Sequence, residues 1–135
     1  MTELEDRQAI SELLVRYATA IDRREWQLLG TVFTAECDVD YGEIGAWQSS
    51  SAVIEFMELA HAMAGYTLHR LSNIAITLEG DGARARTYID ALIMAADNNG
   101  GVNAAGFYDD EVIRTAAGWR IARRQFTSVR VVAVN

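Results

Sequence analysis

Apolar residues recur at three- and four-residue spacing in the first half of the chain, which is typical of amphipathic helices. The spacing predicts a long first helix from residue 4 onward, with the buried positions Ile10, Leu13, Leu14, Tyr17, Ala18 and Ile21. A second, shorter helix is expected from Leu28, Leu29, Val32 and Phe33. A third begins at the N-cap candidates Ser49, Ser50 and Ser51 and ends near Gly65.

The pattern after Gly65 changes to β-rich runs separated by glycine-bearing turns. Four long strands are expected, at 66–80, 83–97, 102–115 and 118–134. The separators GDG, NNGG and TAAG have hairpin length, so neighbouring strands should be antiparallel. Earlier in the chain, a strand is expected to begin near Cys37 and a short edge strand near residues 45–48. The sequence thus predicts one α+β domain spanning 1–135, with three N-terminal helices packed on one curved antiparallel sheet.

Composition narrows the function classes. The formal net charge of −7 disfavours nucleic acid as a partner, because nucleic-acid binders usually carry a basic patch. A single cysteine, Cys37, cannot form an intramolecular disulfide, and the acidic N-terminus does not resemble a signal peptide. No apolar run approaches the length of a membrane span. We therefore expect a cytoplasmic protein with no membrane partner.

Asp22 and His69 are the pair best suited to acid–base chemistry. The chain has only two histidines, and an imidazole oriented by a carboxylate is a proton acceptor that works near neutral pH. Asp22 lies on the flank of the first helical stripe, so it is either a pocket residue or a helix-surface charge. His69 is either the partner of Asp22 or a structural histidine at a strand entrance. His61, late in the third helix, is interpreted as a surface residue.

Strand alternation leaves the orientation of His69 open. It places Ile74, Ile76 and Leu78 on one face of their strand, and His69 and Leu71 on the other unless a bulge intervenes. No GxGxxG or GxxxxGK loop offers a phosphate cradle. Two histidines without a clustered carboxylate motif also indicate no metal site, and we expect no cofactor.

Three segments carry a resemblance to a known family. They are LEDRQAISELLVRYATAIDRREWQLLGTVFTAECDVDYG, HRLSNIAITLEGDGARARTYI and FYDDEVIRTAAGWRIARRQF. In their order and spacing they resemble the SnoaL-like branch of the nuclear transport factor 2 superfamily. The resemblance implies an NTF2-like cone, in which helices are wrapped by a bent sheet. Within that superfamily it points towards scytalone dehydratase and hexachlorocyclohexane dehydrochlorinase.

The resemblance also implies roles for particular residues. Those two enzymes use a His–Asp dyad to remove a proton during elimination, and here Asp22 and His69 match its positions. Arg124 matches an active-site arginine of the dehydrochlorinase, while Tyr17 stands where that enzyme has a lysine. We expect a cofactor-independent, dehydratase-like lyase that acts on a small hydrophobic, cyclic molecule. Its substrate-binding residues would be Tyr17, Phe33, Trp47, Tyr88, Tyr108 and Arg124, of which the aromatic ones suit an ordinary core equally well.

Two other functions fit the same sequence. In a ketosteroid-isomerase-like enzyme, Tyr17 and Asp110 would form the oxyanion hole and Asp40 would be the base. In a non-catalytic binder or accessory subunit, ligand would be held without being consumed, because fold does not determine function. For any of the three, the apolar C-terminal VRVVAV segment predicts a homodimer or homotrimer.

Overall fold

The computed structural model describes residues 2–135. Helix α1 (Glu3–Arg23) begins at Thr2, whose side chain accepts a hydrogen bond from the Glu5 N–H, and it ends at Arg24 in the left-handed conformation. Every member of the apolar stripe expected for this helix is buried. Helix α3 (Ser50–His61) is capped by Ser49, which accepts from the Ala52 N–H. These caps satisfy backbone N–H groups that a helix leaves unpaired.

The second helix is shorter than the sequence predicted. Helix α2 (Trp26–Leu29) covers a single turn, and Phe33 already belongs to strand β1 (Phe33–Asp40). Gly30 follows α2 directly, and the Thr31 hydroxyl donates back to the Leu28 carbonyl. The strand therefore begins four residues before Cys37 rather than at it. After a 3-10 turn (Gly42–Ile44), β1 continues into the short edge strand β2 (Ala46–Trp47).

The four long strands are β3 (Ala64–Glu79), β4 (Gly82–Ala95), β5 (Gly101–Thr115) and β6 (Gly118–Val134). Each pairs antiparallel with its neighbour in sequence, as the turns predicted. The six-stranded sheet has the order β2-β1-β6-β5-β4-β3, and β1 pairs parallel with β6. The α+β fold class is confirmed, with a mixed sheet rather than a purely antiparallel one. This parallel pair joins the first and last strands of the chain, which no hairpin turn connects.

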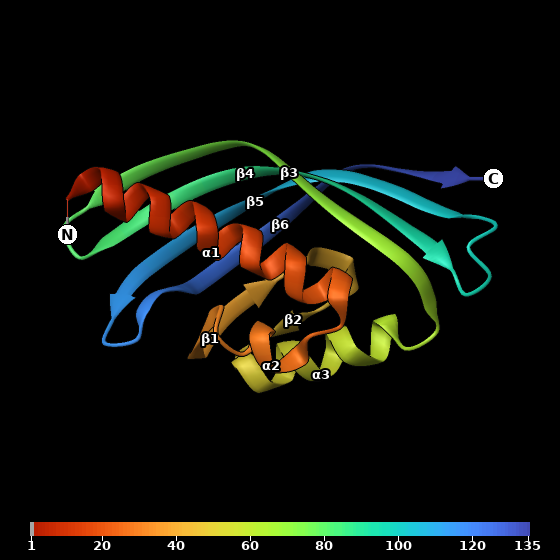
Figure 1. The fold of residues 1–135 in the computed structure, drawn as a ribbon, viewed down its shortest axis with the longest axis horizontal. Helices are drawn as coiled ribbons and strands as arrows, with labels where there is room; N and C mark the ends of the chain where they lie inside the picture. The colour runs from red at the N-terminus through yellow and green to blue at the C-terminus, as the bar shows by residue number, and fades with distance from the viewer. Residues whose placement is uncertain (1) are drawn as a thin grey trace.

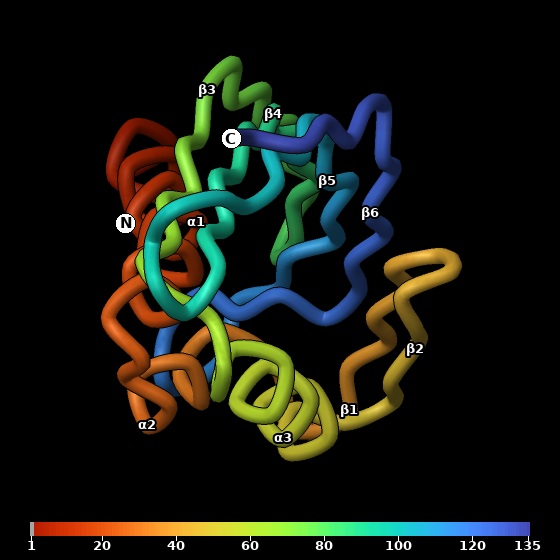
Figure 2. The backbone as a smooth tube through the Cα atoms, turned by 90° about the vertical axis from the view of Figure 1, so that its right-hand side faces the viewer, coloured from red at the N-terminus to blue at the C-terminus, as the bar shows by residue number. Residues whose placement is uncertain are grey.

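Figures 1 and 2 show the resulting layers. Helix α1 crosses the inner face of the sheet, and α2 and α3 lie below it, so that helices cover one side of a strongly bent sheet. Along β4, buried small or apolar residues alternate with exposed ones, as a half-buried strand requires. No helix in residues 2–135 is long and apolar enough to cross a membrane.

A bulge in β3 decides which way His69 points. The register between β3 and β4 shifts between Ser72 and Ala75, and Asn73 adopts a positive φ of 49°. The extra residue restores the inward direction, so His69 and Leu71 share the more buried face with Ile74 and the apolar residues that follow it. The alternative left open by strand alternation is thus resolved in favour of a bulge.

Candidate active site

Asp22 and His69 are in direct contact. The His69 Nδ1 lies 2.7 Å from Asp22 Oδ1, and the His69 backbone N–H donates to Asp22 Oδ2 at 2.9 Å. Their side chains are 22% and 9% exposed, so the pair is largely shielded from solvent. Because an ionised carboxylate only accepts hydrogen bonds, Nδ1 carries the hydrogen and Nε2 is left as the reactive nitrogen of the neutral ring.

Neighbouring groups hold the carboxylate in this orientation. The Thr67 hydroxyl donates to Asp22 Oδ1 at 2.9 Å, and Arg24 in turn donates to the Thr67 oxygen at 2.8 Å. Burial would raise the pKa of Asp22, but the hydrogen bonds from His69 and Thr67 outweigh it and hold that pKa below its ordinary value. The carboxylate is therefore ionised at neutral pH and keeps the hydrogen of the His69 ring on Nδ1.

A cavity of about 210 Å³ lies between α1, α3 and the inner face of the sheet, and His69 is part of its wall. The polar members of the wall are His61, His69 and the tyrosines Tyr17, Tyr41 and Tyr108. The remainder is apolar and includes Phe56, Met57, Ile89, Ile93 and Phe126. Such a mostly apolar space with a few convergent polar groups is the usual form of a small-molecule site.

Two tyrosine hydroxyls meet in this wall. Tyr17 and Tyr41 lie 2.6 Å apart, oxygen to oxygen, and both residues are buried. One hydroxyl donates to the other, and the hydroxyl of Tyr108 also interacts with both, so the three tyrosines form one polar cluster in the wall. Burial raises the pKa of Tyr17 well above its ordinary value, so that this group stays a neutral donor.

A buried ion pair lies behind the tyrosines. Arg124, 1% exposed, donates to both carboxylate oxygens of Asp110 at 2.7 and 2.9 Å. Its guanidinium stacks over Tyr108 at 3.8 Å and Tyr17 at 4.4 Å. Arg124 faces inward as the resemblance implied, but it lies outside the cavity wall and supports the tyrosines from behind.

The remaining predicted binding residues lie in different places. Phe33 is buried in edge-to-face contact with Tyr17, and Trp47 packs on Phe56 and Tyr41, so both support the wall from outside. Tyr88 does not join this cavity. It is 48% exposed and lies on the outer face of the sheet, because it shares the parity of Arg84, Arg86 and Asp90 along β4.

The groups required for a ketosteroid-isomerase-like site are not assembled here. Asp40 is exposed and its Oδ1 accepts the Gly42 N–H at 2.8 Å, which closes the turn after β1. Both oxygens of Asp110 are bound by Arg124, and neither aspartate lines the cavity. The structure therefore gives this alternative no base and no acidic oxyanion donor in the cavity.

Two polar wall residues were missed from the sequence. Tyr41 was not singled out, and His61 was interpreted as a surface residue, whereas it is half-buried and lines the cavity. A signal for His61 was present, because Val53, Met57 and His61 recur every four residues and so lie on one helical face. A signal for Tyr41 was present too, because Cys37, Val39 and Tyr41 alternate with Asp38 and Asp40.

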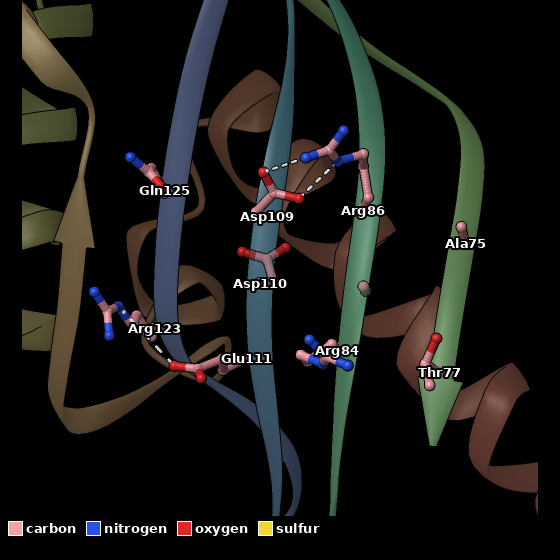
Figure 3. Close-up of a pocket in the computed structure, with 10 residues that line it drawn as sticks. Ala75, Thr77, Arg84, Arg86, Asp109, Asp110, Glu111, Arg123 and Gln125 are labelled. Atoms are coloured by element: carbon pink, nitrogen blue, oxygen red, sulfur yellow. Dashed lines mark hydrogen bonds and ion pairs between the residues drawn. The ribbon is translucent and has the colours of Figure 1, made fainter. Parts of the chain in front are cut away.

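The outer face of the sheet carries a second, open groove of about 580 Å³ (Figure 3). Its charged side chains are largely paired with one another, as in the bidentate contact of Arg86 with Asp109 at 2.7 and 2.9 Å.

In residues 2–135, no three His, Cys, Asp or Glu side chains gather in a way that could hold a metal ion.

Comparison with known proteins places the chain in a family. Residues 2–125 match the SnoaL-like domain. An uncharacterised protein of Mycobacterium tuberculosis is 32% identical over 127 residues, which cover 92% of this chain and 86% of the relative. The chain belongs to the SnoaL-like family.

Solved structures share the SnoaL-like fold over nearly the whole chain. A Novosphingobium aromaticivorans protein that carries the provisional name of scytalone dehydratase superposes with a TM-score of 0.88 and 22% identity, covering 96% of this chain and 87% of its own. A type 2 hexachlorocyclohexane dehydrochlorinase, LinA, superposes with a TM-score of 0.89 and 16% identity, covering 98% and 90%. These likenesses confirm the expected cone.

Proposed function

We propose that this SnoaL-like protein is a cofactor-independent lyase that removes water from a small hydrophobic, cyclic substrate. The observation that carries the proposal is the contact of Asp22 with His69 at 2.7 Å on the wall of an apolar cavity. The fold is shared with a dehydrochlorinase, which agrees with elimination chemistry. An apolar cavity of about 150 Å³ suffices for benzene, so a space of about 210 Å³ suits a substituted single ring or a small bicyclic molecule.

The proposed reaction uses one base and a pair of tyrosines. His69 Nε2 removes a proton from a carbon next to a carbonyl group, and the electron pair of that C–H bond forms the new C=C bond. The C–O bond on the neighbouring carbon breaks, and the departing hydroxide takes the proton from the His69 imidazolium to leave as water. Asp22 stabilises the imidazolium between the two proton transfers.

The tyrosine pair supplies the charge stabilisation. When the C–H proton leaves, negative charge develops on the carbonyl oxygen, and a preorganised donor at that position lowers the barrier. The hydroxyls of Tyr17, Tyr41 and Tyr108, which meet in the cavity wall, would supply such a donor. The buried guanidinium of Arg124 over the Tyr17 ring favours negative charge on this side of the cavity.

The test is a panel of monocyclic and bicyclic aromatic and terpenoid compounds assayed for elimination or isomerisation, followed by variants at the dyad. His69→Ala should lower the rate by about 10²–10⁴, and Asp22→Asn should impair the same step. Because the two residues act together, the double variant should be little slower than His69→Ala alone. The matched control is Asp90→Asn on the exposed outer face, which should leave the rate unchanged.

Full activity in either single variant, or multiplicative rate losses in the double variant, would reject the dyad. Ligand binding without turnover, with affinity unaffected by Asp22→Asn, would instead favour the non-catalytic binder.

We also propose that the chain forms a homodimer or homotrimer. Val129 and Val131 near the end of β6 are 69% and 61% exposed, an arrangement that a covering copy would shield from water. Light scattering at micromolar concentration tests this, and a monomer would contradict it.

A further inference from the structure

His61 is a second histidine in the cavity wall, held differently from His69. It comes from the last turn of α3, and its Nδ1 lies 2.7 Å from the carbonyl oxygen of Met57 one turn earlier. Its ring centroid is 6.3 Å from that of His69, so the two imidazoles are neighbours in the same wall. The dyad chemistry proposed above does not use this residue.

The contact with Met57 determines which nitrogen of His61 carries hydrogen. A backbone carbonyl only accepts hydrogen bonds, so Nδ1 must be the donor. In the neutral ring, Nε2 then has a free lone pair, and it makes no hydrogen bond to any of residues 2–135. Burial, assisted by the nearby Arg24 charge, lowers the pKa of His61 below its ordinary value, which favours the neutral ring at pH 7.

The two histidines therefore differ in the charge of the group to which each Nδ1 donates its hydrogen bond. His69 is held by a carboxylate, which stabilises a proton gained during reaction, whereas His61 is held by a neutral carbonyl in a partly desolvated position. A neutral imidazole with its lone pair free is a good acceptor but a poor acid. The Nε2 atom is accessible rather than fully buried, so a ligand that brings a donor to it takes the place of water there.

We propose that His61 determines specificity by accepting a hydrogen bond from a ring hydroxyl of the substrate at Nε2, so that the substrate class is a hydroxylated cyclic compound. The proposal rests on the cavity being the substrate site of the proposed lyase. The hydroxyl bound by His61 is one that stays on the ring, since an acceptor does not assist the departure of hydroxide. The tyrosine pair then binds the carbonyl oxygen and His69 meets the C–H bond.

The test compares two ligands of nearly equal shape that differ in one donor, 2-naphthol and 2-methylnaphthalene. Wild-type protein should bind 2-naphthol more tightly in a fluorescence or calorimetric titration at pH 7. One neutral hydrogen bond corresponds to a preference of about three- to tenfold. His61→Leu, which keeps an apolar side chain in the wall, should remove that preference. His61→Gln, which keeps an acceptor near the Nε2 position, should retain most of it.

A measurement on unaltered protein covers the case in which the leucine variant fails to fold. Long-range ¹H–¹⁵N spectra should show His61 in the Nδ1-protonated form, and its Nε2 resonance should shift with 2-naphthol but not with 2-methylnaphthalene. An Nε2-protonated ring would overturn the proposal.

The remaining outcomes also decide it. A full preference for 2-naphthol in His61→Leu, an equal loss of both ligands in that variant, or no binding of either ligand by the wild type would each reject the role of His61. The binding titrations with the His61 variants do not depend on catalytic turnover. The loss of activity in His69→Ala is measured in a separate rate assay. A failure of the His61 proposal is therefore distinguishable from a failure of the dyad.

Discussion

Two consecutive aspartates of β5 bind arginine with the same geometry on opposite faces of the sheet. Asp109 on the outer face holds Arg86 at 2.7 and 2.9 Å, and Asp110 on the inner face holds Arg124 at 2.7 and 2.9 Å. The side chains of the outer pair are 40% and 54% exposed, whereas those of the inner pair are 0% and 1% exposed. Figure 3 shows the outer pair among other charged groups of the open groove.

The comparison shows that hydrogen-bond geometry does not determine what an ion pair contributes. The outer pair is screened by water, so losing one partner leaves the other well solvated. Breaking the inner pair would leave an uncompensated charge beside Tyr17 and Tyr108 in a low-dielectric environment. The inner face thus holds its polar groups in fixed positions, which a site requires, while the outer face tolerates change.

The largest effect is expected from Asp110→Ala. It should lower the free energy of unfolding by about 3–5 kcal/mol, because Arg124 would stay buried without its partner. Urea denaturation followed by tryptophan fluorescence measures this. The matched change Asp109→Ala should leave the unfolding midpoint nearly unchanged. Equal losses in the two variants would show that the two faces do not differ as described.

A smaller loss is expected from Tyr41→Phe. The variant removes the 2.6 Å hydrogen bond to the Tyr17 hydroxyl, which should cost about 1 kcal/mol of stability. Tyr88→Phe on the outer face is the control and should be neutral, because the Tyr88 side chain is half exposed. Thermal unfolding of the three proteins side by side provides the measurement, and a larger loss at Tyr88 would contradict the comparison.

Thr87→Val should act in the opposite direction. The Thr87 hydroxyl is buried and has no hydrogen-bond partner in residues 2–135, so its removal by a side chain of the same shape should raise stability by about 1 kcal/mol. Thr77, exposed at the outer groove, is the control, and Thr77→Val should change little. A loss of stability in Thr87→Val would indicate that the hydroxyl binds a water molecule.

The smallest effect concerns acid stability. The folded-state pKa of Asp22 lies below its ordinary value of 3.8, so its ionised form stabilises the fold. This contribution is fully present above the unfolded-state pKa and is lost as the pH falls through the folded-state pKa. Asp22→Asn should therefore flatten the decline of stability below about pH 4, measured by urea titrations between pH 2 and 6. The exposed Asp38→Asn should keep the wild-type slope, and an equal flattening in both would refute the assignment.

Local patterns were sufficient for most of the architecture. The stripe of α1 was predicted because helical periodicity reports burial directly, and the hairpins among β3 to β6 because glycine-bearing turns determine strand pairing locally. Strand alternation also indicates that Tyr88 faces outward, because it lies at two-residue spacing from Arg86 and Arg84. The resemblance to the SnoaL-like family suggested pairing Asp22 with His69 across 47 residues, which periodicity alone left undecided.

Only the tertiary structure decided how the site is assembled. The bulge at Asn73 turns His69 inward, an alternative that strand alternation had left open. The parallel pairing of β1 with β6, and the contact of Tyr41 with Tyr17, join segments whose proximity depends on how the whole sheet bends. Periodicity reports which side of its own element a residue occupies, whereas a cavity depends on the distances between elements, and these are determined by packing.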